Sequence, residues 1–462
     1  MTATRCSPQV CFTTESASFW GCSSRQVLLM NHYIETYWKQ IKQSVLLKDS
    51  LWAVVGNIVG KGLSLIAGIG VARLLGKDIY GEYGLLKNTI LIIGTVSSFG
   101  LAYTATKFIS EYKISDPTKV RLIHRIAVGI TLFFSSVFGG GCVLFSDEIA
   151  SFLDAPHLAY MISLIGIVNV FNAYNATQIG SLAGLGAYKG LAYNNIITGI
   201  VNFVCTIFLT YYYDLLGAVI ALLISYVANC LLNSRLLAAK LPPRDVEISS
   251  YCKDFVRRLL GFSLPIALQE SVYSASQWLI TLMLVKLSDF GELGINSAAT
   301  QWGAVLLFIP SSIRHVALSH LSSSCGNIHN NRLVLDRLSK INFIATAVPA
   351  LICVILSGWI CSWYGATYQG LWPVLIVVII STLIDGQTQV LSSELMSHKR
   401  NWYLFYARVI RDVFQLVLLY CLLYYRLTSG AMAAALVMVI CNILYWRILH
   451  SKIRQIFKYT AL

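Results

Sequence analysis

The chain has 462 residues, of which 56% are apolar and only 12% are charged. Its mean hydropathy of +0.66 excludes a water-soluble globular protein, because such a chain would have too little polar surface to face water. The formal net charge is +14, but the basic residues are distributed over many loops rather than gathered in one soluble domain. We therefore expect no nucleic-acid partner.

Twelve apolar stretches alternate with short loops along the chain. A hydrocarbon core of ~30 Å needs about 20 apolar residues in a helix, and backbone groups in lipid must be satisfied within each segment. The sequence therefore predicts an all-α polytopic membrane protein with about 12 transmembrane helices. The predicted spans are residues 51–73, 83–105, 126–145, 158–180, 193–212, 217–238, 259–285, 296–319, 341–364, 371–393, 402–424 and 429–448.

The residues before the first span are expected to form a cytoplasmic segment, 1–44. The first thirty contain neither an apolar segment of adequate length nor a cleavage site, so we do not expect them to be a signal peptide. Residues 31–42 have the pattern of an amphipathic lead-in to the first span, which makes Met30 a candidate physiological start.

Basic residues concentrate in alternate loops, and this predicts the orientation of the chain. The opposite loops carry only Lys77, Lys286 and Arg426 and are acidic. Both termini are therefore expected in the cytoplasm. The basic side comprises Lys107, Lys113, Lys119, Arg121, Arg125, Arg235, Lys240, Arg244, Lys253, Arg257, Arg258, Arg332, Arg337, Lys340, Lys399 and Arg400, with Arg447, Lys452, Arg454 and Lys458 in the tail.

Six spans precede the longest basic connection and six follow it, which is the pattern of a two-lobe transporter. We expect an N-lobe at 45–238 (helices 1–6), a cytoplasmic linker at 239–258, a C-lobe at 259–448 (helices 7–12) and a basic cytoplasmic tail at 449–462. Transporters built from repeats place the substrate site at the repeat interface near the membrane midplane. The sequence has no re-entrant filter, which a channel would usually show. It also has no phosphate-binding loop, which ATP-driven pumping would need.

The 12 cysteines are scattered without metal-ligand spacing and predict neither a disulfide framework nor a metal site. We expect no cofactor beyond a coupling ion, H⁺ or Na⁺.

Three segments near the first turn carry a resemblance to a known family. They are Gly60–Ser64 (GKGLS), Ala72–Tyr83 (ARLLGKDIYGEY) and Ser98–Leu101 (SFGL). Together they resemble the opening of the polysaccharide flippases, the Wzx-type O-antigen transporters of the MATE-like superfamily. The pattern ARLLG followed by YG and a tyrosine is the most specific part.

Further segments extend the resemblance over roughly residues 45–455. Gly184–Lys189 (GLGAYK) resembles the turn after helix 4 of the family, although Ala187 stands where a basic residue is common. Ser263–Pro265 and Phe308–Pro310 resemble segments of helices 7 and 8.

The resemblance implies a multi-pass protein of the cell inner membrane with a V-shaped, alternating-access fold. Its activity would be to move undecaprenyl-diphosphate-linked oligosaccharide repeat units from the cytoplasmic to the periplasmic leaflet, for O-antigen, lipopolysaccharide or capsule biosynthesis. The implied partners are this substrate, membrane lipids, a polysaccharide polymerase and a chain-length regulator. The protein would not be an enzyme.

Three cations in the first lobe are candidates to bind the diphosphate, because cations offset phosphate charge strongly where the dielectric constant is low. Lys61 lies about ten residues, or ~15 Å, inside the first span, with Asn57 on the same face. Lys87 lies in the second span, and Arg73 lies near the outer end of the first. Arg73 and Lys87 can alternatively extend to the interface, or Arg73 can pair with an acidic residue of the next turn.

The second lobe offers different polar residues. Glu270 and Gln277 share one face of helix 7, and a carboxylate at that depth can bind a coupling ion, pair with Lys61 or bind sugar hydroxyls. A purely structural ion pair remains an equal alternative. In helix 11, the i, i+4 spacing of Arg408 and Asp412 favours a structural pair, which leaves Arg411 as a substrate-cavity candidate.

Other functions remain open at this point. A MATE-type exporter of organic cations or drugs, coupled to Na⁺ or H⁺, would need acidic residues in the first lobe, where Lys61 and Lys87 instead repel cations. A peptidoglycan-precursor flippase commonly has two more C-terminal helices. A polymerase or ligase would present a large periplasmic loop. In a purely structural membrane protein, Lys and Glu buried within the spans would be unusual, because charged residues there are energetically costly.

Overall fold

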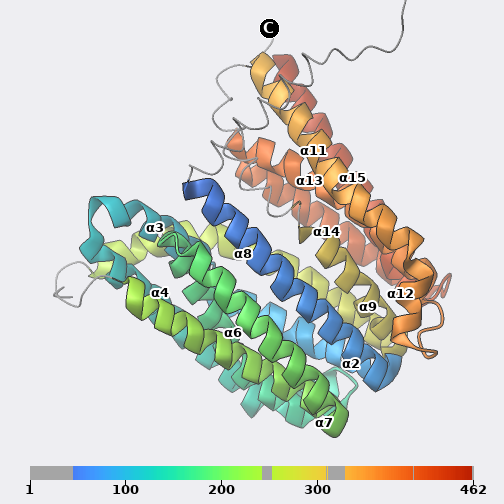
Figure 1. Cartoon of the computed structure of the whole chain (residues 1–462). Coiled ribbons are helices and arrows are strands. Elements are labelled where there is room, and N and C mark those ends of the chain that lie inside the picture. The colour runs from blue at the N-terminus through green and yellow to red at the C-terminus, as the bar shows by residue number, and fades with distance from the viewer. Residues whose placement is uncertain (1–44, 242–251, 309, 311–327, 399, 460–462) are drawn as a thin grey trace, which may run out of the picture. The chain divides into compact units, whose positions relative to one another are not determined.

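The computed structural model describes residues 45–241, 252–308, 310, 328–398 and 400–459. Residues 52–462 form one compact unit, which is described here by itself. Over the described residues the elements are helical, as expected for an all-α membrane protein (Figure 1). The predicted N-terminal segment 1–44 with Met30, much of the linker, and part of the span 296–319 lie outside the described residues.

The first half of the chain contains two helices that are about twice the length of a membrane span. The elements are α2 (Val45–Ser98), α3 (Leu101–Ser115), α4 (Pro117–Leu144), α5 (Ser146–Phe152), the short η1 (Pro156–Leu158), α6 (Ala159–Gly184) and α7 (Tyr188–Lys240). α2 and α7 each combine two predicted spans, and each reverses at an internal turn. The turn of α2 is at Gly76, with φ of 73°, and that of α7 includes Asp214, with φ of 47°.

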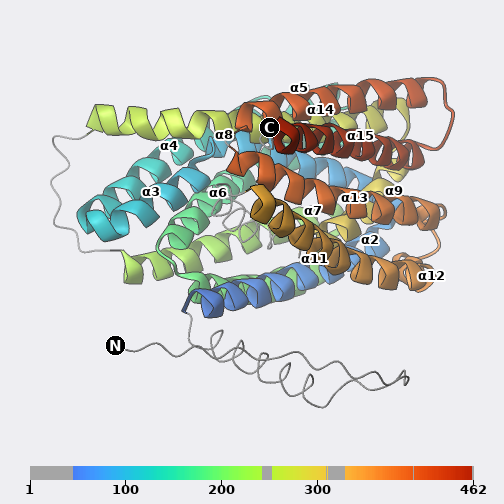
Figure 2. The same ribbon diagram turned by 90° about the horizontal axis from the view of Figure 1, so that it is seen from above.

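The second half consists of shorter helices. They are α8 (Cys252–Leu287), α9 (Phe290–Leu306), α11 (Ile328–Ile355), α12 (Ser357–Tyr364), α13 (Leu371–Ser397), α14 (Asn401–Tyr424) and α15 (Gly430–Tyr459). α13 packs against α9, α11 and α15, while α14 packs against α8 and α15. In Figure 2, α13 lies between α11 and α15.

Seven helices in the described part of the chain are long and apolar enough to cross a membrane. They lie within α2, α4, α6, α7, α11, α13 and α15, with both predicted spans of α2 and of α7 counted within one helix. Large apolar side chains are exposed on these helices, for example Phe133 (65%) and Leu351 (62%). Such a surface is suited to lipid rather than water. The expected polytopic, all-α class is confirmed.

The turns between helices lie at two opposite ends of the bundle. The outer end carries the turns at Gly76, Asp214 and Asp289, and the inner end carries those at Asp116 and Gly186. The charge distribution predicts that the outer end faces the periplasm.

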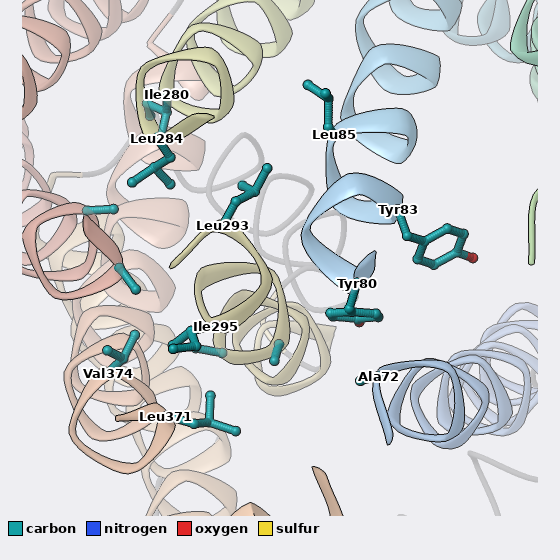
Figure 3. Packing of buried hydrophobic residues seen from close by; sticks show 14 of the residues in the cluster. Ala72, Tyr80, Tyr83, Leu85, Ile280, Leu284, Leu293, Ile295, Leu371 and Val374 are labelled. Atoms are coloured by element: carbon teal, nitrogen blue, oxygen red, sulfur yellow. The ribbon is translucent and has the colours of Figure 1, made fainter. Parts of the chain in front are cut away.

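Helices of the two halves pack closely at the outer end. Figure 3 shows Tyr80 and Tyr83 of α2 and Leu293 and Ile295 of α9 among the buried residues of this core. The backbones also approach each other, since a Cβ atom on Gly81 would lie 1.8 Å from the carbonyl oxygen of Phe290. Only glycine fits at that position, so the contact depends on the absence of a side chain.

Candidate substrate cavities

The first cavity, of about 450 Å³, lies in the first half of the chain, and both candidate lysines line it. Lys61 comes from the first arm of α2 and Lys87 from the second arm, beyond the turn at Gly76. The turn in α2 therefore brings together two cations that are 26 positions apart in the sequence. The other polar lining residues are Ser64, Tyr83, Asn195, Thr198, Asn202, Thr206, Ser225, Tyr226 and Asn229.

The lysines are exposed in this cavity and rest on aromatic rings. The Nζ of Lys61 lies 4.9 Å from the ring centroid of Phe308, and the Nζ of Lys87 lies 5.3 Å from that of Tyr83. Neither lysine forms an ion pair with any residue that the structure describes, and none of the described lining residues is acidic. The cavity therefore offers positive charge without an internal counter-ion.

A network of asparagines supports the wall of this cavity. Asn194 donates to the Oδ1 of Asn233 at 2.8 Å. Asn233 in turn donates to Asn175 at 2.9 Å and to Asn229 at 2.8 Å. Because the Oδ1 of Asn229 is already an acceptor, its NH₂ group is the part that remains to donate to a ligand. No sequence pattern singles out these residues, since each looks like an isolated polar residue within an apolar span.

The second cavity, of about 350 Å³, lies in the second half and has a different character. Its lining includes three predicted residues, Glu270, Gln277 and Arg411, together with Asp385 and Arg408. Glu270 and Gln277 lie on one face of α8, as their spacing predicts. This cavity is lined by both carboxylates and guanidinium groups, whereas the charged residues that line the first cavity are both lysines.

Arg411, which lines the second cavity, is the closest cation to Asp412. Arg411 is buried and donates from Nε at 2.7 Å, and also from Nη2, to the Oδ1 of Asp412. The i, i+4 pair expected from the sequence is longer, with 3.8 Å between the Nε of Arg408 and the Oδ2 of Asp412. Arg408 also lies 4.4 Å from the ring centroid of Tyr273. Arg408 is therefore the arginine whose guanidinium is freer to bind a ligand. The charge of Arg411 is largely offset by Asp412.

Two predicted residues do not join these cavities in the described structure. Arg73 is exposed and lines neither cavity. It forms no ion pair with the acidic residues of the adjacent turn that are described. The side chain of Asn57 lies outside the part of the chain that the structure describes.

A family model described as "Polysaccharide biosynthesis protein" matches residues 46–318, which is more than half of the chain. The chain belongs to this family. The resemblance read from the segments around Ala72–Tyr83 is thereby confirmed. The uncharacterized membrane protein MJ1375 of Methanocaldococcus jannaschii is 24% identical to this chain over 247 residues. That match covers 49% of this chain and 56% of the relative, so the chain spans little more than half of the relative's length.

Solved structures of MATE transporters have the same fold. The inward-facing conformation of a multidrug resistance MATE family transporter of the MOP superfamily gives a TM-score of 0.76 at 15% identity, over 89% of this chain and 100% of that chain. The outward-facing conformation gives 0.64 at 15% identity, over 89% and 94%. This member of the polysaccharide biosynthesis family is therefore similar in fold to MATE transporters, and its helices match the inward-facing arrangement more closely. The family is thus that of polysaccharide biosynthesis proteins, and the fold is that of the MATE structures.

Proposed function

We propose that the protein is a flippase that moves undecaprenyl-diphosphate-linked oligosaccharide from the cytoplasmic to the periplasmic leaflet for surface polysaccharide biosynthesis. The observation that carries the proposal is the first cavity, where Lys61 and Lys87 stand without a carboxylate. A diphosphate bears at least two negative charges, and two lysines that line the same cavity can offset them. The NH₂ group of Asn229 adds a donor suited to phosphate or sugar oxygens.

The mechanism we propose is alternating access between the predicted lobes, 45–238 and 259–448. Lys61 and Lys87 bind the head group from the inner end while the polyprenyl tail stays in lipid. The close packing of the outer end supports an inward-facing starting state, because it blocks that end. The protein then acts in the inner membrane with both termini in the cytoplasm, and it delivers its cargo to a polymerase and a chain-length regulator.

Coupling is the role we propose for Glu270. It lines the second cavity with Asp385, and neither carboxylate forms an ion pair with a described residue. Carboxylates at such depth can bind H⁺ or Na⁺. The same two carboxylates are the observation that favours the second candidate, an exporter of organic cations.

The deciding experiment is complementation of a strain deleted for this gene. Wild-type protein should relieve the build-up of undecaprenyl-diphosphate oligosaccharide on the inner leaflet, and a Lys61→Ala/Lys87→Ala variant should not. Lys240→Ala is a matched control, because Lys240 is an exposed cation at the end of α7 outside both cavities. Membrane levels of each variant are measured in parallel. No build-up in the deletion strain, together with increased sensitivity to cationic drugs, would favour the exporter instead.

A further inference from the structure

A groove of about 1240 Å³ lies between α11 and α15, over α13, apart from the two substrate cavities. α13 packs against both neighbours, and its Leu383, Gln387 and Leu391 form the floor. The second cavity is lined by other residues of α13, such as Asp385 and Gln389. Because successive residues of a helix are rotated by about 100°, these two sets lie on different faces. The groove is therefore separate from the proposed transport path.

We propose that this groove binds an anionic phospholipid with two phosphates, of the cardiolipin class. Four cations line it: Arg332 and Lys340 on α11, and Arg447 and Arg454 on α15. α11 begins and α15 ends at the inner end, so both pairs lie toward that end of the groove. All four side chains are exposed, and none forms an ion pair with another described residue.

The charge of the groove exceeds what a lipid with one phosphate requires. Asp336, between Arg332 and Lys340, is the one carboxylate among its described lining residues, so three positive charges remain in excess. Basic pockets between transmembrane helices on the cytoplasmic side are the usual sites for lipids with several phosphates. Two phosphates match the excess and can be bound by cations from both walls.

The groove becomes apolar away from its charged end. Phe343 and Ile344 follow Lys340 along α11, and Ile443 precedes Arg447 on α15. These apolar side chains are 49%, 60% and 41% exposed, respectively. Trp446, which also lines the groove, is suited to the boundary between head groups and acyl chains. This gradient fits an amphipathic ligand whose phosphates lie at the inner end and whose acyl chains extend toward the membrane middle.

The test is native mass spectrometry of the purified full chain, titrated with cardiolipin and, separately, with phosphatidylglycerol. Wild-type protein should retain one cardiolipin in preference to phosphatidylglycerol, and Arg447→Gln/Arg454→Gln should weaken that binding by about tenfold or more. The matched control is Arg235→Gln/Lys240→Gln, which removes two cations from the inner end of α7, outside the groove. The control should bind cardiolipin as the wild type does.

Three outcomes would overturn the proposal. An equal loss of cardiolipin binding in the control variant would show that the overall positive charge of the protein, and not the groove, attracts the lipid. Unchanged binding by the groove variant would place the lipid elsewhere. Displacement of cardiolipin by undecaprenyl diphosphate at lower concentration would identify the groove as a loading site for the transported lipid.

A second variant, Ile443→Trp, fills the apolar part of the groove without changing its charge. This variant should weaken cardiolipin binding while leaving the melting temperature of the lipid-free protein unchanged.

Discussion

Tyr80 of α2 donates a hydrogen bond of 2.8 Å to the Oε1 of Gln301 on α9, and this bond joins the two halves of the chain. The same amide donates from Nε2 to the carbonyl oxygen of Ser64 at 3.3 Å. Gln301 thus contacts both arms of α2, one on each side of the turn at Gly76. Asn88 and Thr281 make a further contact between the halves, at 2.7 Å. In the proposed alternating-access mechanism, opening of the outer end would break these bonds.

A single methyl group at Gly81 is expected to prevent closure of the outer end. The carbonyl of Phe290 is backbone and cannot move aside easily, so Gly81→Ala should shift the population toward an outward-open state and reduce flipping at least several-fold. Gly62→Ala on the same helix is the control, because a Cβ there meets nothing within 4 Å. Spin labels across the outer end would report the distance. An unchanged distance distribution in Gly81→Ala would contradict the expectation.

Removing Arg411 should destabilise the protein, whereas removing Arg408 should mainly impair transport. Arg411→Ala leaves the carboxylate of Asp412 buried without its closest cation, at a cost of about 3–5 kcal/mol. The double change Arg411→Leu/Asp412→Leu removes both charges and should recover most of the stability. Melting temperatures in detergent test this order. Equal destabilisation by Arg408→Ala would show that Asp412 depends on both arginines.

Asn233→Leu is expected to disconnect the amide network behind the first cavity. Three hydrogen bonds would be lost, and at about 0.6 kcal/mol each within a membrane the total is roughly 2 kcal/mol. With Asn229 no longer held, the apparent KM for the lipid-linked substrate should rise. Leu231→Ala on the adjacent, exposed surface is the control. If KM stays constant while stability falls, the network is structural only.

Glu270→Gln distinguishes coupling from substrate binding. If the carboxylate binds the coupling ion, transport into vesicles should lose its response to an imposed H⁺ or Na⁺ gradient, while substrate binding is retained. Glu148→Gln, an exposed carboxylate of α5 outside both cavities, should preserve the response. A full gradient response in Glu270→Gln would remove this residue from the coupling mechanism.

The sequence predicts the helices well because apolar length and loop charge report directly on membrane spans. Lys61 and Lys87 could be named as candidates from their depth in the spans, but their shared cavity depends on how α2 folds back at Gly76. The spacing rule for helices favoured Arg408 as the partner of Asp412. The neighbour Arg411 is closer, because rotamers and packing, which no sequence pattern encodes, decide between adjacent residues. For the same reason the contact of Gln301 with α2 could not be anticipated.

In the proposed mechanism, the turn at Gly76 also affects how tightly the substrate is bound. Lys61 and Lys87 belong to the two arms of one helix, so the angle at this glycine sets the separation of the two charges. A change of φ and ψ at one residue would move the ammonium groups apart and lower the local potential felt by a diphosphate. Affinity and conformation would then change together, and the cargo would be released when the arms spread, without a separate signal for release.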